Sequence, residues 1–337
     1  MKLFLFMSML MMIGAASIHA AAPITAVAIA PDGKQIVLGS QSGIEIRSWP
    51  DWAVIKTLST ELEHVHDLKF SPDGLSLLAA GGSPAESGRV ELWSWTTGKR
   101  IRNMDGHDDV VYRVAWSPDG KQWVTCSGDG RCLVFSAETA QRLAQYEGHS
   151  RAVLAVCFLD DQTVASGGVD QTVRLWNSSD GSHLRTLDNH VGTVNDIAVR
   201  PPTEPSVEVI ATISEDRTVR LWQPRIGRLM RFARLPSVPR SLAWSCDAKK
   251  LFVGCNDGRV RIIDADSMQV ATELDGLVGR IHDLAVSPTR GHILTAGTTG
   301  CHAIKASYIT RRPVAVIDPV LLTQLKFLLG DFIRRCL

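Results

Sequence analysis

The sequence repeats one short apolar strand, together with the turn that follows it, seven times. The copies are AVAIA before Pro31, DLKFS before Pro72, RVAWS before Pro118, AVCFL before Asp160, DIAVR before Pro201, SLAWS before Cys246 and DLAVS before Pro288. Successive copies are 41, 46, 42, 41, 45 and 42 residues apart. Such a period is typical of folds in which one structural unit stacks on copies of itself. A chain built in this way favours a rigid surface over a dedicated catalytic pocket.

One repeat, residues 148–188, shows what the unit is. Its apolar segments AVLAVCFL, TVASGG, TVRLWN and HLRTL are separated by short polar turns. Segments of this length and pattern predict four antiparallel strands. One such sheet would expose two apolar faces, and stacking copies around an axis covers both. The sequence therefore predicts an all-β fold, a seven-bladed β-propeller of four-stranded antiparallel blades.

The two ends of the chain differ from the repeats, which span residues 21–317. Lys2, the apolar run LFLFMSMLMMIGAASI and Ile18-His19-Ala20 predict a signal peptide over residues 1–20 and export to a periplasm or out of the cell. The alternative is a membrane anchor, but the run is shorter than the roughly 20 apolar residues that span a bilayer. Residues 318–337 could form an amphipathic C-terminal helix or a tail, and membrane contact is considered only there.

Composition narrows the classes of partner. The sequence has 36 basic and 35 acidic residues, and removal of Lys2 with the signal peptide balances them. A balanced chain lacks the clustered basic excess of nucleic-acid binders, so no nucleic-acid partner is expected. With 337 residues and 45% hydrophobic content, the chain can bury a core without disulfides or metals. We expect a monomeric propeller.

The cysteine and histidine patterns do not predict a cofactor or a metal. Seven cysteines are present, but no CxxC or CxxCH motif occurs, which argues against redox, zinc-ribbon and covalent-haem chemistry. We expect buried apolar thiols, with Cys126 and Cys132 as the one pair to test for a disulfide across a hairpin. His64 and His66 place two imidazoles on one side of an extended segment, and Asp67 follows. No third ligand is implied by their spacing, so a metal site is not predicted.

Two more motifs recur in phase with the strands. A Gly-His or Asn-His pair ends at His107, His149 and His190 before the inner strand, and Val-Arg-Leu-Trp closes the third strand at Trp176 and Trp222. On these motifs the chain resembles WD-repeat β-propellers, over roughly residues 24–317, and is identified as an exported bacterial-type member of that family.

The resemblance implies hydrogen-bonded sets inside the blades. The implied sets are His149, Ser166, Asp170 and Trp176; His190, Thr212, Asp216 and Trp222; and His107, Thr125 and Asp129 with Phe135 in place of the tryptophan. The same residue types make hydrolase triads. Because these sets recur blade after blade, we expect a structural role and no catalytic residue.

The terminal repeats depart from the pattern. Repeats 1, 2, 6 and 7 lack the Gly-His pair, and the tryptophan column is predicted to hold Arg47, Ile263 and Lys305 in repeats 1, 6 and 7. Blade 7 is expected to take its outer strand from Arg312 to Ile317. The segment from Ala79 to Gly88 lengthens the second turn of repeat 2 and is predicted to be a mobile partner-binding or ligand-binding loop.

Candidate binding residues lie where each inner strand begins and on the second turns, which a propeller brings to one face. Polar and aromatic side chains of the kinds that anchor interfaces occur there. The candidates are His66, Tyr112, Asn195, Glu215, Arg240, Asn256 and His282.

The leading hypothesis is a non-catalytic exported scaffold that binds a protein or peptide partner on this face. The alternative is a propeller enzyme, or an accessory subunit of an exported redox system, with a site in the central channel. His66, His282, Asp67 and Asp283 are the residues that the sequence offers for such a site.

Overall fold

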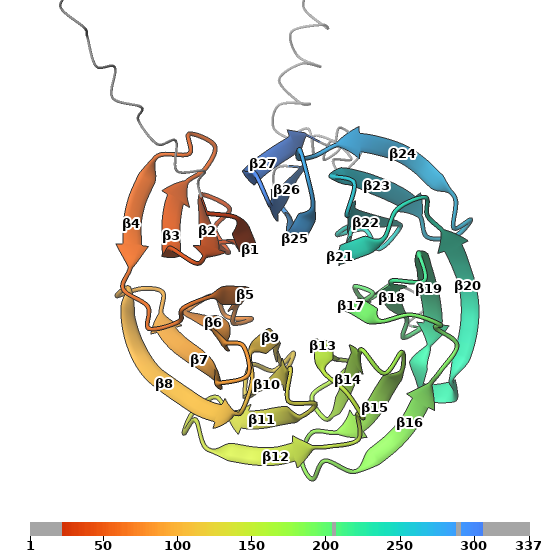
Figure 1. Ribbon diagram of the computed structural model, residues 1–337, viewed down its shortest axis with the longest axis horizontal. Helices are drawn as coiled ribbons and strands as arrows, with labels where there is room; N and C mark the ends of the chain where they lie inside the picture. Colours follow the sequence, from red (N-terminus) through yellow and green to blue (C-terminus); the bar gives the residue numbers. More distant parts are fainter. Residues whose placement is uncertain (1–21, 204–206, 288–290, 306–337) are drawn as a thin grey trace, which may run out of the picture.

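Seven antiparallel sheets are arranged like blades around a common axis (Figure 1). The computed structural model describes residues 22–203, 207–287 and 291–305. Six sheets have four strands, and in the described residues the last has three. Each blade runs outward in chain order, so its first strand lies nearest the axis (Figure 1). The predicted all-β, seven-bladed propeller is confirmed. The segments 1–20 and 318–337 and the expected outer strand Arg312 to Ile317 lie outside the described residues.

Each blade is formed by strands that are consecutive in the chain. Blades 1 to 4 comprise β1 Ile24–Ile29, β2 Gln35–Ser40, β3 Gly43–Ser48 and β4 Val54–Leu58; β5 Val65–Phe70, β6 Ser76–Ser83, β7 Ser87–Ser94 and β8 Lys99–His107; β9 Val111–Trp116, β10 Gln122–Ser127, β11 Cys132–Ser136 and β12 Arg142–Tyr146; and β13 Val153–Phe158, β14 Thr163–Gly168, β15 Val173–Asn177 and β16 His183–Leu187. Blades 5 to 7 comprise β17 Val194–Val199, β18 Ile210–Ser214, β19 Thr218–Gln223, the 3-10 helix η1 Pro224–Ile226 and β20 Arg228–Arg234; β21 Pro239–Trp244, β22 Lys250–Cys255, β23 Arg259–Asp264 and β24 Val270–Asp275; and β25 Ile281–Val286, β26 His292–Gly297 and β27 Gly300–Lys305.

The turn after each inner strand explains the recurrent Pro-Asp-Gly motif. In blade 1 the Gly33 amide donates to the Ala30 carbonyl at 2.8 Å, which places Pro31 at the first central position of a β-turn. Proline has the backbone φ that this position needs, and Gly33 adopts a φ of 65°, which favours glycine. Gly74 and Gly120 close equivalent turns onto Ser71 and Ser117 at 2.9 Å.

Burial is highest in the second strand of a blade and lowest in the outer strand, and this difference follows the sequence pattern. Every residue of β14 and β18 is buried, whereas β16 buries only its last residue. The two middle strands of a blade are covered on both faces by neighbouring blades, so they contain continuous apolar runs. Trp176 and Trp222 are fully buried between blades.

The ring closes because blade 7 packs directly on blade 1. Leu294 and Ala296 of β26 join a buried cluster with Ile36 and Leu38 of β2. The strand register corrects one expectation. Trp176 pairs with Val164, and the corresponding pair in blade 7 is Ile304 with Ile293. The tryptophan column therefore holds the buried Ile304, and Lys305 is exposed one residue further on. A shift of one residue reverses which face of a strand is buried.

The prediction that Ala79 to Gly88 forms a loop is wrong, while its binding of a partner or ligand stays a prediction. Instead, β6 and β7 extend toward each other as a hairpin, and their pairing continues to Ser83 and Ser87. The Ala85 amide at the tip donates to the Asp109 carboxylate at 2.8 Å. Because its backbone amides and carbonyls are paired in the ladder, the segment forms regular strands with a short turn. Within the described ranges, no helix combines the length and apolar character needed to cross a membrane.

Candidate functional site

Every inner strand contains a β-bulge at its second residue. The pairing to the middle strand skips one residue in each blade, for example between Val65 and Asp67 in β5 and between Val194 and Asp196 in β17. A bulged residue is left out of the ladder, and the bulge redirects its side chain. The seven bulged residues are Thr25, His66, Tyr112, Leu154, Asn195, Arg240 and His282.

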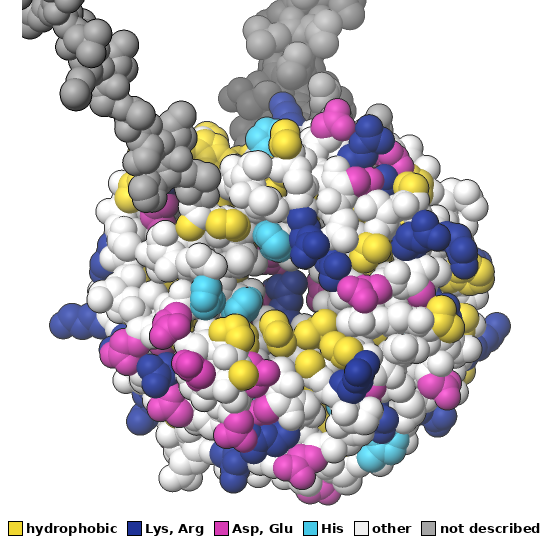
Figure 2. Space-filling view, viewed as in Figure 1, with side chains coloured by type: hydrophobic (Ala, Val, Ile, Leu, Met, Phe, Trp, Pro, Cys, Tyr) yellow, Lys and Arg dark blue, Asp and Glu magenta, His cyan; other side chains and the backbone are white. Residues whose placement is uncertain are grey.

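All seven bulged side chains line a single cavity of about 320 Å³ at one end of the axis. Arg113 and Arg280 complete its lining, and we call this cavity the mouth. Figure 2 shows basic and histidine side chains gathered around the central opening. The bulges thus bring one side chain from each blade to the same place, although these residues are spread along most of the chain.

The structure places all seven predicted partner-binding residues in or beside the mouth. Five of them are bulged residues that line it. The other two contact Arg240 from the second turns: Glu215 forms an ion pair with its guanidinium at 3.2 Å, and Asn256 accepts a hydrogen bond from its Nε at 2.8 Å. Asn195 is largely buried and donates to the Pro239 carbonyl at 2.9 Å.

Sequence reasoning missed four residues that line the mouth. Thr25 and Leu154 occupy the same bulge position as the predicted residues, so the repeat register alone could have found them. Arg113 is the first residue of the RVAWS copy of the repeat, so the register could have found it as well. Arg280 precedes β25 and no motif marks it, so only the arrangement of the blades around the axis brings it into the mouth.

The mouth is electropositive. Three arginines line it, and no carboxylate of the described residues does. Burial, followed by the nearby His64 and the charge of Arg113, lowers the pKa of His66 to about 4. Burial and the charges of Arg280 and Arg240 lower the pKa of His282. Both histidines are therefore neutral at neutral pH, because burial and the neighbouring positive groups disfavour a further positive charge.

Beneath the mouth, Arg113 is surrounded by acidic side chains in the channel. Its guanidinium lies 3.2 Å from Asp67 and 3.1 Å from Asp283, with Asp196 at 3.9 Å. Lys69 pairs with Asp67 at 3.6 Å. Burial alone would lower the pKa of Arg113, but the carboxylates keep it well above its usual value.

The same carboxylates tie neighbouring blades together. Asp67 accepts the amide of Val114, Asp196 accepts the amide of Leu242 and Asp283 accepts the amide of Val27, at 3.0, 2.9 and 3.0 Å. Ser241 accepts the amide of Leu284 in the same way at 3.1 Å. Asp67 and Asp283, which the enzyme alternative offered for a channel site, are thus bound to Arg113 and to the backbone of the next blade.

Blade 4 contains a chain of hydrogen bonds that places a proton on Nδ1 of its histidine, His149. The Trp176 indole donates to the Ser166 hydroxyl at 3.1 Å, which lies 2.8 Å from His149 Nε2. Because the Asp170 carboxylate can only accept, the Nδ1–H of His149 donates to it at 3.0 Å, while Nε2 faces the Ser166 hydroxyl. In blade 5 His190, Thr212, Asp216 and Trp222 are connected in the same order.

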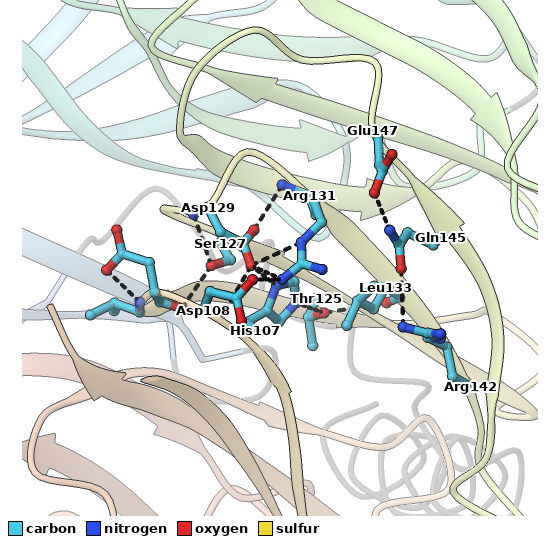
Figure 3. A network of polar contacts seen from close by, with 12 residues as sticks. His107, Asp108, Thr125, Ser127, Asp129, Arg131, Leu133, Arg142, Gln145 and Glu147 are labelled. Carbon is cyan, nitrogen blue, oxygen red and sulfur yellow. Dashed lines mark hydrogen bonds and ion pairs between the residues drawn. The ribbon is translucent and has the colours of Figure 1, made fainter. Parts of the chain in front are cut away.

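Blade 3 keeps the polar set, which Figure 3 shows, but has Phe135 in place of the indole donor. His107 Nδ1 lies 2.8 Å from Asp129, and His107 Nε2 lies 2.7 Å from Thr125. The Thr125 hydroxyl also reaches the Leu133 carbonyl at 3.3 Å, and Phe135 stacks on Trp123. Three blades therefore repeat one buried network, which is a property of the scaffold.

Blade 2, which lacks the histidine, uses a different residue at its centre. Glu91 on β7 is completely buried and accepts four hydrogen bonds. Its donors are the Trp93 indole at 3.1 Å, the Thr60 hydroxyl at 2.8 Å, the Glu61 amide at 2.8 Å and Arg100 at 2.7 Å. The carboxylate thus links β7 and β8 to the segment that precedes the blade.

Blade 6 also lacks the histidine and substitutes an arginine. Arg261 on β23 is 1% exposed and holds the turn residue Asp257 through two hydrogen bonds of 3.1 and 2.8 Å. Its Nε donates to Glu273 at 2.9 Å. A planar guanidinium suits this two-point contact with a carboxylate. Neither Glu91 nor Arg261 was predicted from the sequence.

The cysteines and the candidate metal ligands show no reactive grouping. Cys126 and Cys132 face each other across the β10–β11 ladder, and both are free and buried. Burial raises the pKa values of both thiols, which disfavours the reactive thiolate. Within the described part of the chain, no group of three potential ligands could hold a metal ion.

The turn aspartates should make stability depend on pH. Burial by itself would raise the pKa of Asp216, but hydrogen bonds from Thr218 and His190 lower it to about 2. Asp216 therefore stabilises the folded state above the unfolded pKa of about 4, and this contribution is lost as the pH falls toward about 2.

Asp216→Asn is accordingly expected to lower the free energy of unfolding by about 1–2 kcal/mol at neutral pH, and by less at acid pH. Urea unfolding at neutral pH and at about pH 3 measures the difference. Asp188→Asn, at an exposed position, is the matched control and should change little at either pH. A loss from Asp216→Asn that is the same at both pH values would contradict the assignment.

Comparison with known proteins identifies the family. The profile described as "WD domain, G-beta repeat" matches residues 98–136, 140–177 and 181–223, and that of the "Anaphase-promoting complex subunit 4 WD40 domain" matches residues 204–286. The chain is 30% identical over 298 residues to a guanine nucleotide-binding protein subunit beta of Zea mays, covering 80% of this chain and 76% of that protein. A second protein of the same name, from Oryza sativa subsp. japonica, is 29% identical over 296 residues with the same coverage. The anaphase-promoting complex subunit cdc20 of Dictyostelium discoideum is 24% identical over 243 residues, covering 69% of this chain and 47% of that protein. The chain belongs to the WD-repeat family.

Proposed function

We propose that this protein is a non-catalytic scaffold that binds a protein or peptide partner at the mouth. The observation that carries the proposal is the set of bulges, one in each blade, whose side chains line one cavity. Two histidines, a tyrosine, an asparagine and three arginines meet there, and such side chains are suited to anchoring a partner. A rigid ring holds them in position at little entropic cost.

Two further observations support a scaffold. The His, Ser or Thr, and Asp sets recur in three blades and are buried between sheets, which fits a structural network better than a single reacting centre. Two of the related proteins are named as subunits, one of a guanine nucleotide-binding protein and one of the anaphase-promoting complex. We include export in the proposal, on the basis of Lys2 and the apolar run after it.

Site-specific photocrosslinking tests the proposed face. A photoreactive phenylalanine analogue in place of Tyr112, in the full chain and in the cells that produce it, is expected to form discrete adducts with a partner protein. Tyr112 lies in the mouth 5.5 Å from His66, between ring centroids, so the probe would sit where a partner is expected. Adducts are identified by mass spectrometry.

The same analogue at Leu184 provides the control, because Leu184 is 52% exposed on the outer strand β16. We expect it to give few or no adducts of the same mass. Adducts that form equally from both positions, or from neither, would argue against the mouth as the binding site.

A further inference from the structure

The positive charge at the mouth is not fully neutralised within the described part of the chain. Arg240 has one acidic partner, Glu215. Arg280 is exposed, and its side chain makes no hydrogen bond or ion pair with any described residue. Arg113 is balanced by the channel aspartates below it. Among the described residues, the guanidinium of Arg280 therefore faces the mouth without a counter-charge.

The two arginines from blades 6 and 7 also repel each other. Burial lowers the pKa of Arg240, and the nearby charge of Arg280 lowers it further, against the opposing effect of Glu215. An anion bound between the two guanidinium groups would relieve this repulsion and satisfy donors that now face solvent.

The opposite side of the mouth has a different chemistry. Tyr112 and Leu154 come from blades 3 and 4, which lie across the ring from blades 6 and 7 (Figure 1). Their side chains offer an aromatic and an aliphatic surface within the same cavity. A ligand that fits the whole mouth would therefore carry an anionic group and an apolar group a few ångströms apart.

We propose that the mouth binds an acidic peptide segment of the partner, with a carboxylate between Arg240 and Arg280 and a neighbouring apolar side chain against Tyr112 and Leu154. This proposal rests on the proposed function and adds the chemistry of the partner. The carboxylate is a planar acceptor that a guanidinium can hold with two hydrogen bonds. The apolar contact supplies the part of the affinity that salt does not screen.

Fluorescence anisotropy with short labelled peptides tests the proposal on the full-length protein. The acidic probe is Gly-Glu-Glu-Leu-Gly, and the neutral probe is Gly-Gln-Gln-Leu-Gly. At low salt we expect the acidic probe to bind at least about tenfold more tightly than the neutral one. Replacing the leucine of the acidic probe by serine should weaken binding severalfold.

Arg280→Glu is expected to weaken binding of the acidic probe by about tenfold or more. Arg228→Glu is the matched control, because Arg228 is also exposed, on the outer strand β20, and has no side-chain partner among the described residues. The control makes the same change in net charge and should alter affinity by less than about twofold. Thermal unfolding of both variants verifies that they fold.

Three results would overturn the proposal: equal binding of the acidic and neutral probes, equal losses from Arg280→Glu and Arg228→Glu, or about tenfold tighter binding of a phosphoserine peptide of the same charge. The last result would assign the mouth to phosphate. If the acidic probe fails but the analogue at Tyr112 still crosslinks a partner, only the acidic chemistry is wrong. If neither binding of the acidic probe nor crosslinking from position 112 is observed, the proposed function is wrong as well.

Discussion

Arg113→Met is expected to lower the free energy of unfolding by about 3–5 kcal/mol, because it leaves the buried Asp283 without its ion-pair partner and Asp67 with Lys69 alone. The Asp67 side chain is 0% exposed and the Asp283 side chain is 4% exposed, and both lie within 3.2 Å of the Arg113 guanidinium. Methionine fills a similar volume but offers no charge and no hydrogen-bond donor. Urea unfolding of the purified protein, followed by circular dichroism, measures the loss.

A matched substitution separates the buried pair from a surface one. Arg225→Met removes the same group from its ion pairs with Asp160 and Glu208, where the Arg225 side chain is 54% exposed. We expect that variant to lose less than about 1 kcal/mol, since exposed pairs contribute little. Adding Asp67→Asn and Asp283→Asn to Arg113→Met should restore at least half of the stability, because amide oxygens can still accept from the neighbouring blades. Equal losses from Arg113→Met and Arg225→Met would contradict a buried charge network.

The blades could be predicted from the sequence because each one is specified locally. Pro72-Asp73-Gly74 and its counterparts encode a turn whose geometry depends only on neighbouring residues. The apolar runs before and after them determine which strands are covered on both faces. The repeat then supplies the ring, because a sheet with two apolar faces needs a neighbour on each side.

The repeat register accounts for much of both the mouth and the channel. His66 and Arg240 occupy one repeat position, so their convergence follows from the repeat once the ring closes. Arg113, Asp67 and Asp283 occupy the next position of their inner strands, so the register also places them at one level of the channel. Arg113 and Asp283 are 170 residues apart in the chain, and only the closed ring shows that these two side chains pair.

Blades 2 and 6, two of the four that lack the histidine, show a second limit of sequence reasoning. Arg261 occupies the position of Arg174 and Arg220, which are partly exposed and pair with their turn aspartates at 3.7 and 3.4 Å. Arg261, in a blade without the histidine, is buried and holds Asp257 with two hydrogen bonds. Glu91 occupies the same repeat position in blade 2, where repeat 1 has the partly buried Glu45. The sequence shows which residue stands at this position, but not which side chain is buried.

Glu91→Ala is expected to lower the free energy of unfolding by about 3–5 kcal/mol, since it removes a buried acceptor of four hydrogen bonds. The Trp93 indole and the Glu61 amide would lose their partner, and Arg100 would keep only Glu61 as an acidic contact. Glu91→Gln is expected to lose less, yet still more than about 1 kcal/mol, because its amide nitrogen must face one pair of the existing donors.

Glu138→Ala is the matched control for this prediction, because Glu138 is exposed on the neighbouring blade. We expect that control to stay within about 0.5 kcal/mol of the wild type. Unfolding in urea, monitored by both circular dichroism and tryptophan fluorescence, also tests whether the ring unfolds as one unit, since coincident transitions indicate a single cooperative step. If Glu91→Ala loses no more than Glu138→Ala, the carboxylate does not hold the blade. If the two transitions of Glu91→Ala separate, part of the ring unfolds before the rest, and the carboxylate stabilises that part locally.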